Sequence, residues 1–356
     1  MWSEVVSRRN RVALLLVFVV CLKLPATATA ILANRTNTGR DGGTVLALAI
    51  DPRTSTTLYA GTAGGVFKTD DGGVNWRAVT TGLTNLIVRN LAIHPQIPAT
   101  IYAGTSGGGV FQSLDGGTSW RAINTGLPKG DVGAVAINPQ TPTTVYAGIF
   151  LGMSRGVFRS TDGGDNWRVL VSGSVTSLAI DPKNPTTIYA TTTDDGVIKS
   201  TDGGGSWRAV NAGLTSPSIA VLAIDPKAPA TIYVGVSRAI PGATKNRGVF
   251  KSVDGGATWR ATNAGLTWAY VNSLVIDPHT PSIIYAAIWS AGVYKSTDGG
   301  RSWHNVSQGL TSSVVNILAI DPRAPMTLYA GCESRGIFKS VDGGGIWRAI
   351  NAGLTW

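Results

Sequence analysis

The sequence predicts an all-β protein built from one repeated unit, and three observations carry this prediction. Charged residues make up only 14% of the 356 residues, against about 25% in an average globular chain, which disfavours long salt-bridged helices. Glycine and proline, at 45 and 17 residues, separate short runs of β-branched and aromatic residues, a pattern typical of strands and turns. The motif Asp-Gly-Gly-x-x-Trp recurs along the chain, beginning at Asp71, Asp115, Asp162, Asp202, Asp254, Asp298 and Asp342.

Each copy of the repeat contains four strand-like segments. In the last copy they are 317–320, 327–330, 336–340 and 347–350. Four short antiparallel strands in a unit of about 45 residues are the pattern of a propeller blade. The sequence therefore predicts that residues 31–356 form a single seven-bladed β-propeller, with the Asp motif in the hairpin between the third and fourth strands of each blade. The repeated tryptophans and tyrosines are expected to fill the gaps between blades.

The first thirty residues have the pattern of a secretory signal peptide. Arg8, Arg9 and Arg11 precede the apolar run 12–20, and the small residues 26–30 offer cleavage sites. The run is short for a membrane span, which needs about 20 residues, although an uncleaved anchor is the alternative. We therefore expect a secreted or periplasmic protein with no membrane span in the mature chain. Its one remaining thiol, Cys332, leaves no intramolecular disulfide.

The spacing Ser/Thr-x-Asp-x-Gly-x-x-Trp is that of the Asp box. The chain resembles the Asp-box (BNR-repeat) propellers, a group that includes sialidases, xyloglucanases, sortilin-type receptors and the photosystem II assembly factor. This resemblance implies that the box is a structural hairpin and that its seven aspartates have structural roles. The chemistry agrees, because a carboxylate can accept N–H groups across a tight turn and glycine permits positive φ.

Departures from the repeat are the candidates for function, because they gather in loops at one end of the blades. This face is expected to bind a protein or polysaccharide. The predicted ligand-binding residues are Phe150, Arg155, Arg238, Trp268, Tyr270, Trp289 and Arg335. Trp268, Tyr270 and Trp289 are expected either to stack on sugar rings or a protein partner, or to pack beneath the long loops.

Glycoside hydrolysis would need two carboxylates about 5–10 Å apart. Once Glu4, the repeat aspartates, Asp70 and Asp165 are set aside, the candidates are Asp41, Asp131, Asp194, Asp195 and Glu333. The pair Asp194-Asp195 replaces a glycine of the repeat and is the best candidate, with a solvated loop as the alternative. The Phe/Tyr-Arg-Ile-Pro motif of sialidases is missing, and 62–65 lacks the aspartate that xyloglucanases carry in that segment. The leading hypothesis is a non-catalytic binding or assembly module, and the alternative is a xyloglucanase-like or sialidase-like glycoside hydrolase.

The remaining chemistry predicts few other partners. The lysines and arginines recur at fixed repeat positions, which favours a solvated blade surface over a nucleic-acid site. His94, His279 and His304 lie on distant repeats, so neither a metal site nor a Ser-His-Asp triad is expected. We expect a monomer without a cofactor.

Overall fold

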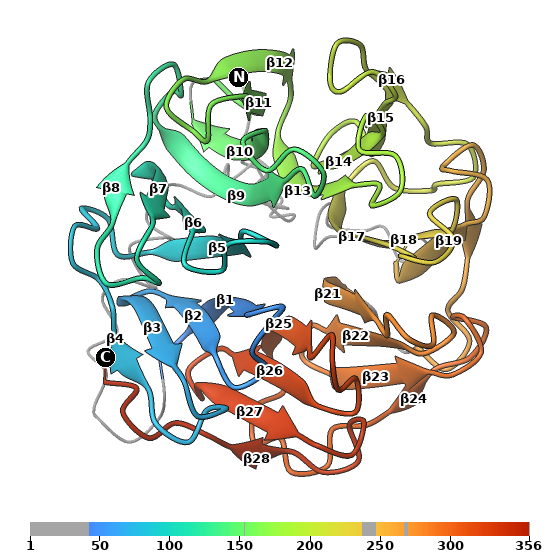
Figure 1. Ribbon diagram of the computed structural model, residues 1–356. Coiled ribbons are helices and arrows are strands. Elements are labelled where there is room, and N and C mark those ends of the chain that lie inside the picture. Colours follow the sequence, from blue (N-terminus) through green and yellow to red (C-terminus); the bar gives the residue numbers. More distant parts are fainter. Residues whose placement is uncertain (1–42, 153, 237–246, 267–269, 356) are drawn as a thin grey trace, which may run out of the picture. The chain divides into compact units, whose positions relative to one another are not determined.

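The computed structural model describes residues 43–152, 154–236, 247–266 and 270–355. The chain divides into two units, Met1–Thr36 and Asn37–Trp356, and every described residue belongs to the second. This unit is an all-β, seven-bladed propeller of seven four-stranded antiparallel sheets, which surround a central axis (Figure 1). The predicted fold class is therefore confirmed.

Each blade takes its four strands from one continuous stretch of chain, in order from the axis outwards. The first strands of blades 1 to 7 are β1 (Val45–Ile50), β5 (Val88–Ile93), β9 (Gly130–Ile137), β13 (Val175–Ile180), β17 (Ile219–Ile224), β21 (Val271–Ile276) and β25 (Val315–Ile320). The second strands are β2 (Leu58–Thr62), β6 (Ile101–Thr105), β10 (Val145–Gly152), β14 (Ile188–Thr192), β18 (Ile232–Val236), β22 (Ile284–Ile288) and β26 (Leu328–Cys332). The third strands are β3 (Gly65–Thr69), β7 (Gly109–Ser113), β11 (Gly156–Ser160), β15 (Val197–Ser200), β19 (Val249–Ser252), β23 (Gly292–Ser296) and β27 (Ile337–Ser340).

The outermost strands show the main irregularity. They are β4 (Arg77–Ala78), β8 (Arg121–Ala122), β12 (Arg168–Ser172), β16 (Arg208–Ala209), β20 (Arg260–Ala261), β24 (His304–Asn305) and β28 (Arg348–Ala349). Six of these strands have two residues, and β12 of blade 3 has five. Blade 3 therefore has a longer outer edge than the other six blades.

The core lies in the seams between consecutive blades, which we name by the two blades that meet. In seam 1/2, for example, Tyr59 of blade 1 and Trp120 of blade 2 belong to one buried cluster. The Tyr59 hydroxyl donates to the Gly116 carbonyl of the next blade over 3.0 Å. Burying the aromatic rings while pairing their polar groups gives each seam both apolar contact and a fixed register.

The seven hairpins between third and fourth strands, here called Asp hairpins, share one hydrogen-bond pattern. In blade 5 the Ser252 hydroxyl donates to Asp254 over 2.7 Å and accepts the Gly256 N–H over 2.8 Å. Asp254 also accepts the N–H and the hydroxyl of Thr258. These bonds lower the pKa of the Asp254 carboxyl to about 2 and hold the turn closed.

The strand order separates the loops into two faces. The Asp-Pro loops between first and second strands lie at the same end of the blades as the Asp hairpins, and we call this end the hairpin face. The loops between second and third strands, and the connectors from one blade to the next, lie at the other end, the loop face. The irregular segments of the sequence therefore belong to the loop face.

One expectation about charge is wrong. The arginines that follow the hairpin tryptophans, such as Arg260, are exposed as expected. The residue before the hairpin hydroxyl is basic in six blades and is not simply solvated: Lys251 is partly buried and lies 5.2 Å from the centre of the Tyr233 ring. Its ammonium donates to the Gly299 carbonyl of the next blade over 3.0 Å, so this position joins blades.

Candidate functional site

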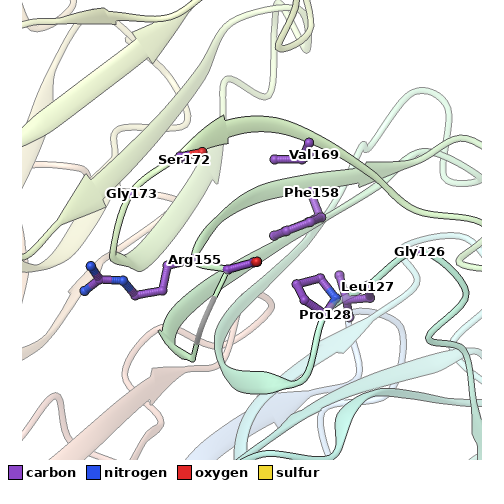
Figure 2. A pocket seen from close by; sticks show the side chains of 9 residues that line it. Gly126, Leu127, Pro128, Arg155, Phe158, Val169, Ser172 and Gly173 are labelled. Atoms are coloured by element: carbon purple, nitrogen blue, oxygen red, sulfur yellow. The ribbon is translucent and has the colours of Figure 1, made fainter.

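The loop face of blade 3 contains a pocket of about 670 Å³. On one side lie Leu127 and Pro128, from the connector between blades 2 and 3, and they face Phe158 and Val169 of β11 and β12 (Figure 2). Arg155, from the β10–β11 loop, borders the pocket and is exposed, and its guanidinium extends away from the apolar side chains (Figure 2). An apolar floor with a few polar groups at the rim is the usual character of a ligand pocket.

The long strand β12 creates this pocket. At the fourth position after the hairpin tryptophan, blade 3 has Val171, whereas blade 2 has Asn124, whose side chain binds the N–H of Val110 and the carbonyl of Gly108. Valine cannot make these bonds and favours an extended backbone. Val171 therefore pairs with Val157, and β12 continues to Ser172 beside the pocket.

The predicted acidic pair lies next to this pocket, on the β14–β15 loop of blade 4. The Thr193 N–H donates to the carbonyl of Ser174, which holds the loop against the connector of blade 3. A carboxylate oxygen of Asp195 lies 3.8 Å from the place that a β-carbon on Gly173 would occupy. Asp194 is exposed and accepts the Thr193 hydroxyl over 3.0 Å. Of the pair, Asp195 is the one that borders the pocket.

Asp131 and Phe150 meet at a third residue, Arg89, which the sequence reading did not single out. The Arg89 guanidinium lies 3.5 Å from the Asp131 carboxylate and 5.4 Å from the centre of the Phe150 ring. Arg89 is the bulged residue of β5, between the paired residues Val88 and Asn90. The cluster therefore lies where β5 begins, on the loop-face side of the inner strands.

A second aromatic cluster lies on the loop face of blades 5 and 6. The Arg247 guanidinium is 4.6 Å from the centre of the Tyr270 ring, and the Tyr270 carbonyl accepts the N–H of Trp289 over 2.9 Å. Both aromatic residues are partly buried. Tyr270 and Trp289 are thus linked through the backbone, and their role in ligand binding stays a prediction.

The other predicted residues are dispersed or lie outside the described residues. Arg335 is exposed and Glu333 is partly buried on the β26–β27 loop of blade 7. Asp131 and Asp195 belong to other blades, blade 3 and blade 4. Asp41, Arg238 and Trp268 lie outside the described residues. The candidate carboxylates therefore come from blades 3, 4 and 7.

Other reactive groups give little support for chemistry. Burial raises the pKa of the Cys332 thiol to about 12, so a thiolate nucleophile is disfavoured there. Among the residues that the structure describes, no group of three or more His, Cys, Asp or Glu side chains is suited to a metal ion. That part of the chain also contains no helix that could cross a membrane.

The residues that sequence reasoning missed had detectable signals. Arg89 occupies a position where other repeats carry small or uncharged residues, such as Thr176 and Asn272. Pro128 replaces the threonine of the Gly-Leu-Thr phrase seen in other connectors, and blade 3 has Gly173-Ser174 where the other six blades have Gly-Leu. A comparison of each repeat with the others, position by position, would have marked these residues.

Comparisons with known proteins agree with this architecture. A family model described as "Sortilin, neurotensin receptor 3" matches residues 155–286. A search of curated proteins gives no match. Together with the solved structures below, the family match is that of a β-propeller protein.

The similar solved structures have different roles. A GH74 xyloglucanase from Xanthomonas campestris is 18% identical with a TM-score of 0.73, over 88% of this chain and 55% of that one. A structure described as YCF48 bound to D1 peptide is 17% identical with a TM-score of 0.63, over 85% and 94% of the two chains. The extracellular domain of a one-component system from B. thetaiotaomicron is 16% identical with a TM-score of 0.64, over 85% and 39%. The chain spans about 55% of the length of the GH74 enzyme, and these likenesses define the class as a seven-bladed propeller without selecting one role.

Proposed function

We propose that this chain is an exported, non-catalytic propeller that binds an extracellular polypeptide through its loop face. The observation that carries the proposal is the pocket of about 670 Å³ at the irregular blade 3. Its apolar residues, such as Leu127 and Val169, suit the side chains of a protein ligand, and the exposed Arg155 guanidinium suits an acidic group of the ligand beside the pocket. The leader-like residues 1–30 support export.

A polypeptide is favoured over a polysaccharide because of the arginines on the loop face. Sugar rings bind proteins by stacking on open aromatic faces, but Arg89 already covers one face of Phe150, and Arg247 one face of Tyr270. Aromatic and arginine groups held in this way are typical of protein interfaces. A polysaccharide ligand remains the second candidate of the binding hypothesis.

A glycoside hydrolase of the xyloglucanase-like or sialidase-like type is the alternative, favoured by the likeness to GH74 enzymes and by Asp195 beside the pocket. A general acid of this kind usually lies in a desolvated site that keeps it protonated, whereas Asp194 and Asp195 are exposed and Asp131 is paired with Arg89. These features favour binding without hydrolysis.

The test is a binding screen with a pocket-filling variant. The full chain would be presented to arrays of extracellular proteins and of polysaccharides, including xyloglucan and sialosides, and binding measured by biolayer interferometry. We expect Val169→Trp, which fills the pocket, to weaken binding of the selected protein about tenfold. The matched control is Val253→Trp, because Val253 is similarly exposed, at 65% against 56%, but lies on the hairpin face.

Two outcomes would contradict the proposal. One is equal binding by Val169→Trp and Val253→Trp, which would move the ligand away from the pocket. The other is release of sugar from the polysaccharides by the wild-type chain and its loss in Asp195→Ala, which would establish the hydrolase.

A further inference from the structure

Six of the seven seams are closed by the same pair of hydrogen bonds from the hairpin tryptophan. The indole N–H donates to the carbonyl of the third residue after the tryptophan of the preceding blade, over 2.7–2.9 Å. The backbone N–H of the same tryptophan donates to the carbonyl of the fifth residue after the tryptophan of the preceding blade, over 2.8–2.9 Å. The donors are Trp76, Trp120, Trp167, Trp259, Trp303 and Trp347, and all six are 2–6% exposed.

The connector between the two blades then passes over the backbone of the tryptophan in the same way in all six seams. The residue at this crossing, the sixth after the tryptophan of the preceding blade, is a glycine with φ between 82° and 92°. A β-carbon on that glycine would lie only 2.1–2.2 Å from the carbonyl oxygen of the tryptophan, so no larger side chain fits. The seventh residue is a leucine that packs on the cluster of the seam, as Leu214 does in seam 4/5.

Seam 3/4 lacks this cover. Within the described part of the chain, the indole nitrogen of Trp207 is buried and has no hydrogen-bond partner, and its backbone N–H makes no bond to the connector of blade 3. Trp207 is also the one hairpin tryptophan of the described chain that is not fully buried, and Leu170 and Val171 beside it are partly exposed.

The cause is the same irregularity that forms the pocket. In blade 3 the fourth and seventh positions are Val171 and Ser174 in place of the asparagine and leucine of blade 4. The backbone therefore runs straight along β12, and Gly173 adopts φ 150° and does not cross the tryptophan. The two N–H donors of Trp207 lack the connector carbonyls that accept them in the other six seams, and its ring, Leu170 and Val171 form an apolar shelf that is partly open to solvent. A buried polar group without a partner is rare and calls for an explanation.

We propose that the shelf at Trp207 is a second binding site, which takes a turn of the Asn-x-Gly-Leu type from a partner polypeptide. The six closed seams specify the chemistry of this partner. It presents two carbonyls, separated by one residue, to the two N–H groups of Trp207, then a glycine where the chain crosses, then a leucine against Leu170 and Val171. The site lies at the outer edge of seam 3/4, whereas the pocket residues Leu127 and Val169 belong to seam 2/3 and the blade 2 side of β12.

The probe is a synthetic peptide, Val-Asn-Ala-Gly-Leu-Thr, which copies residues 210–215 that cover Trp259. A control peptide carries valine in place of its glycine. Binding to the full chain would be followed by the indole ¹⁵N–¹H signals of the tryptophans. We expect the Trp207 signal to shift with the first peptide and not with the second, because valine would clash with the Trp207 carbonyl.

Two protein variants make the test specific. Trp207→Phe keeps the ring but removes the indole donor, and we expect about tenfold weaker binding of the peptide, followed with a fluorescent label, since one hydrogen bond accounts for about that factor. Trp259→Phe, in a seam that is already covered, should leave binding unchanged. The double variant Val171→Asn with Ser174→Leu should restore the cover within the chain, slow hydrogen exchange at the Trp207 indole and abolish binding.

The inference is overturned if the peptide causes no shift at millimolar concentration, if both peptides bind equally, or if Trp207→Phe binds as well as the wild type. Val169→Trp separates this site from the loop-face site. It should reduce binding of the loop-face protein and leave the turn peptide unaffected, so failure at one site is distinguishable from failure at the other.

Discussion

In six of the seven blades, the residue that precedes the hairpin hydroxyl joins one blade to the next. Lys199, Lys251, Lys295 and Lys339 each donate to a glycine carbonyl in the following Asp hairpin, over 2.9–3.0 Å. The carbonyls of Gly255, Gly299 and Gly343 also accept the tyrosine hydroxyl of their seam, as Gly299 accepts Tyr233. Burial lowers the pKa of Lys199 and Lys251, which agrees with side chains that have left bulk water.

We predict that Lys251→Met destabilises the propeller by about 1 kcal/mol, because it removes one charged hydrogen bond that is only partly shielded from water. Lys251→Arg should be close to neutral, since Arg159 makes the equivalent bond to Gly203 in blade 3. Urea denaturation of both variants measures the difference. Equal stability of Lys251→Met and the wild type would show that the bond is only a surface contact.

Within each Asp hairpin, a buried hydroxyl group organises the turn. Ser252 is 1% exposed and binds both Asp254 and the Gly256 N–H. Blade 1 uses Thr69 in the same way, with bonds to Asp71 and Gly73. A hydroxyl, and not serine itself, is what the turn needs.

Ser252→Ala is therefore expected to cost about 1–3 kcal/mol of folding free energy, because it leaves the Gly256 N–H buried without a partner. Ser252→Thr should retain most of the stability. The two unfolding free energies can be compared by chemical denaturation. A loss for threonine as large as that for alanine would mean that packing around the side chain, and not the hydroxyl, decides the stability.

Elements that repeat seven times could be predicted from the sequence, because each strand and turn is written again in the next unit. The strands, their order and the Asp hairpins were predictable for this reason. Strand β12 was not, because the residues Val171 and Ser174 depart from the connector of the other blades and the chain continues there as a strand. The role of Lys251 also escaped prediction, since its partner, Gly299, lies in another blade and spacing along the chain does not reveal that contact.

The candidate site was predictable only in part. Tyr270 and Trp289 are neighbours through a backbone hydrogen bond, and Asp195 lies beside a pocket that the sequence did not reveal. Arg89 could not be paired with Asp131 and Phe150 from the sequence, because all three lie on different strands or loops. Repetition predicts the frame of this protein, whereas departures from repetition need the three-dimensional arrangement to show which of them meet.

At the scale of the whole ring, blades 1 and 7 close without a shared strand, because each takes all four strands from its own stretch of chain. The closure uses the ordinary bonds of a seam: the Trp76 indole donates to Ile350, and Lys339 donates to Gly72. Ser55 adds a bond to Asp321. Since every seam contains a buried tyrosine, loss of the tyrosine contacts should affect the whole ring together.

The seam tyrosines allow this to be tested with pH. Burial raises the pKa of Tyr189, Tyr233, Tyr285 and Tyr329 to about 12, from an ordinary value of 10.0. The folded ring therefore favours the neutral phenol, and the stabilisation is fully present below pH 10 and is lost as the pH rises through about 12. We expect most of the nine tyrosines to ionise in one step, together with loss of the near-ultraviolet circular dichroism. The measurement is a titration of tyrosinate absorbance alongside the dichroism; gradual ionisation near pH 10 with the dichroism intact would contradict a ring that depends on these buried hydroxyls.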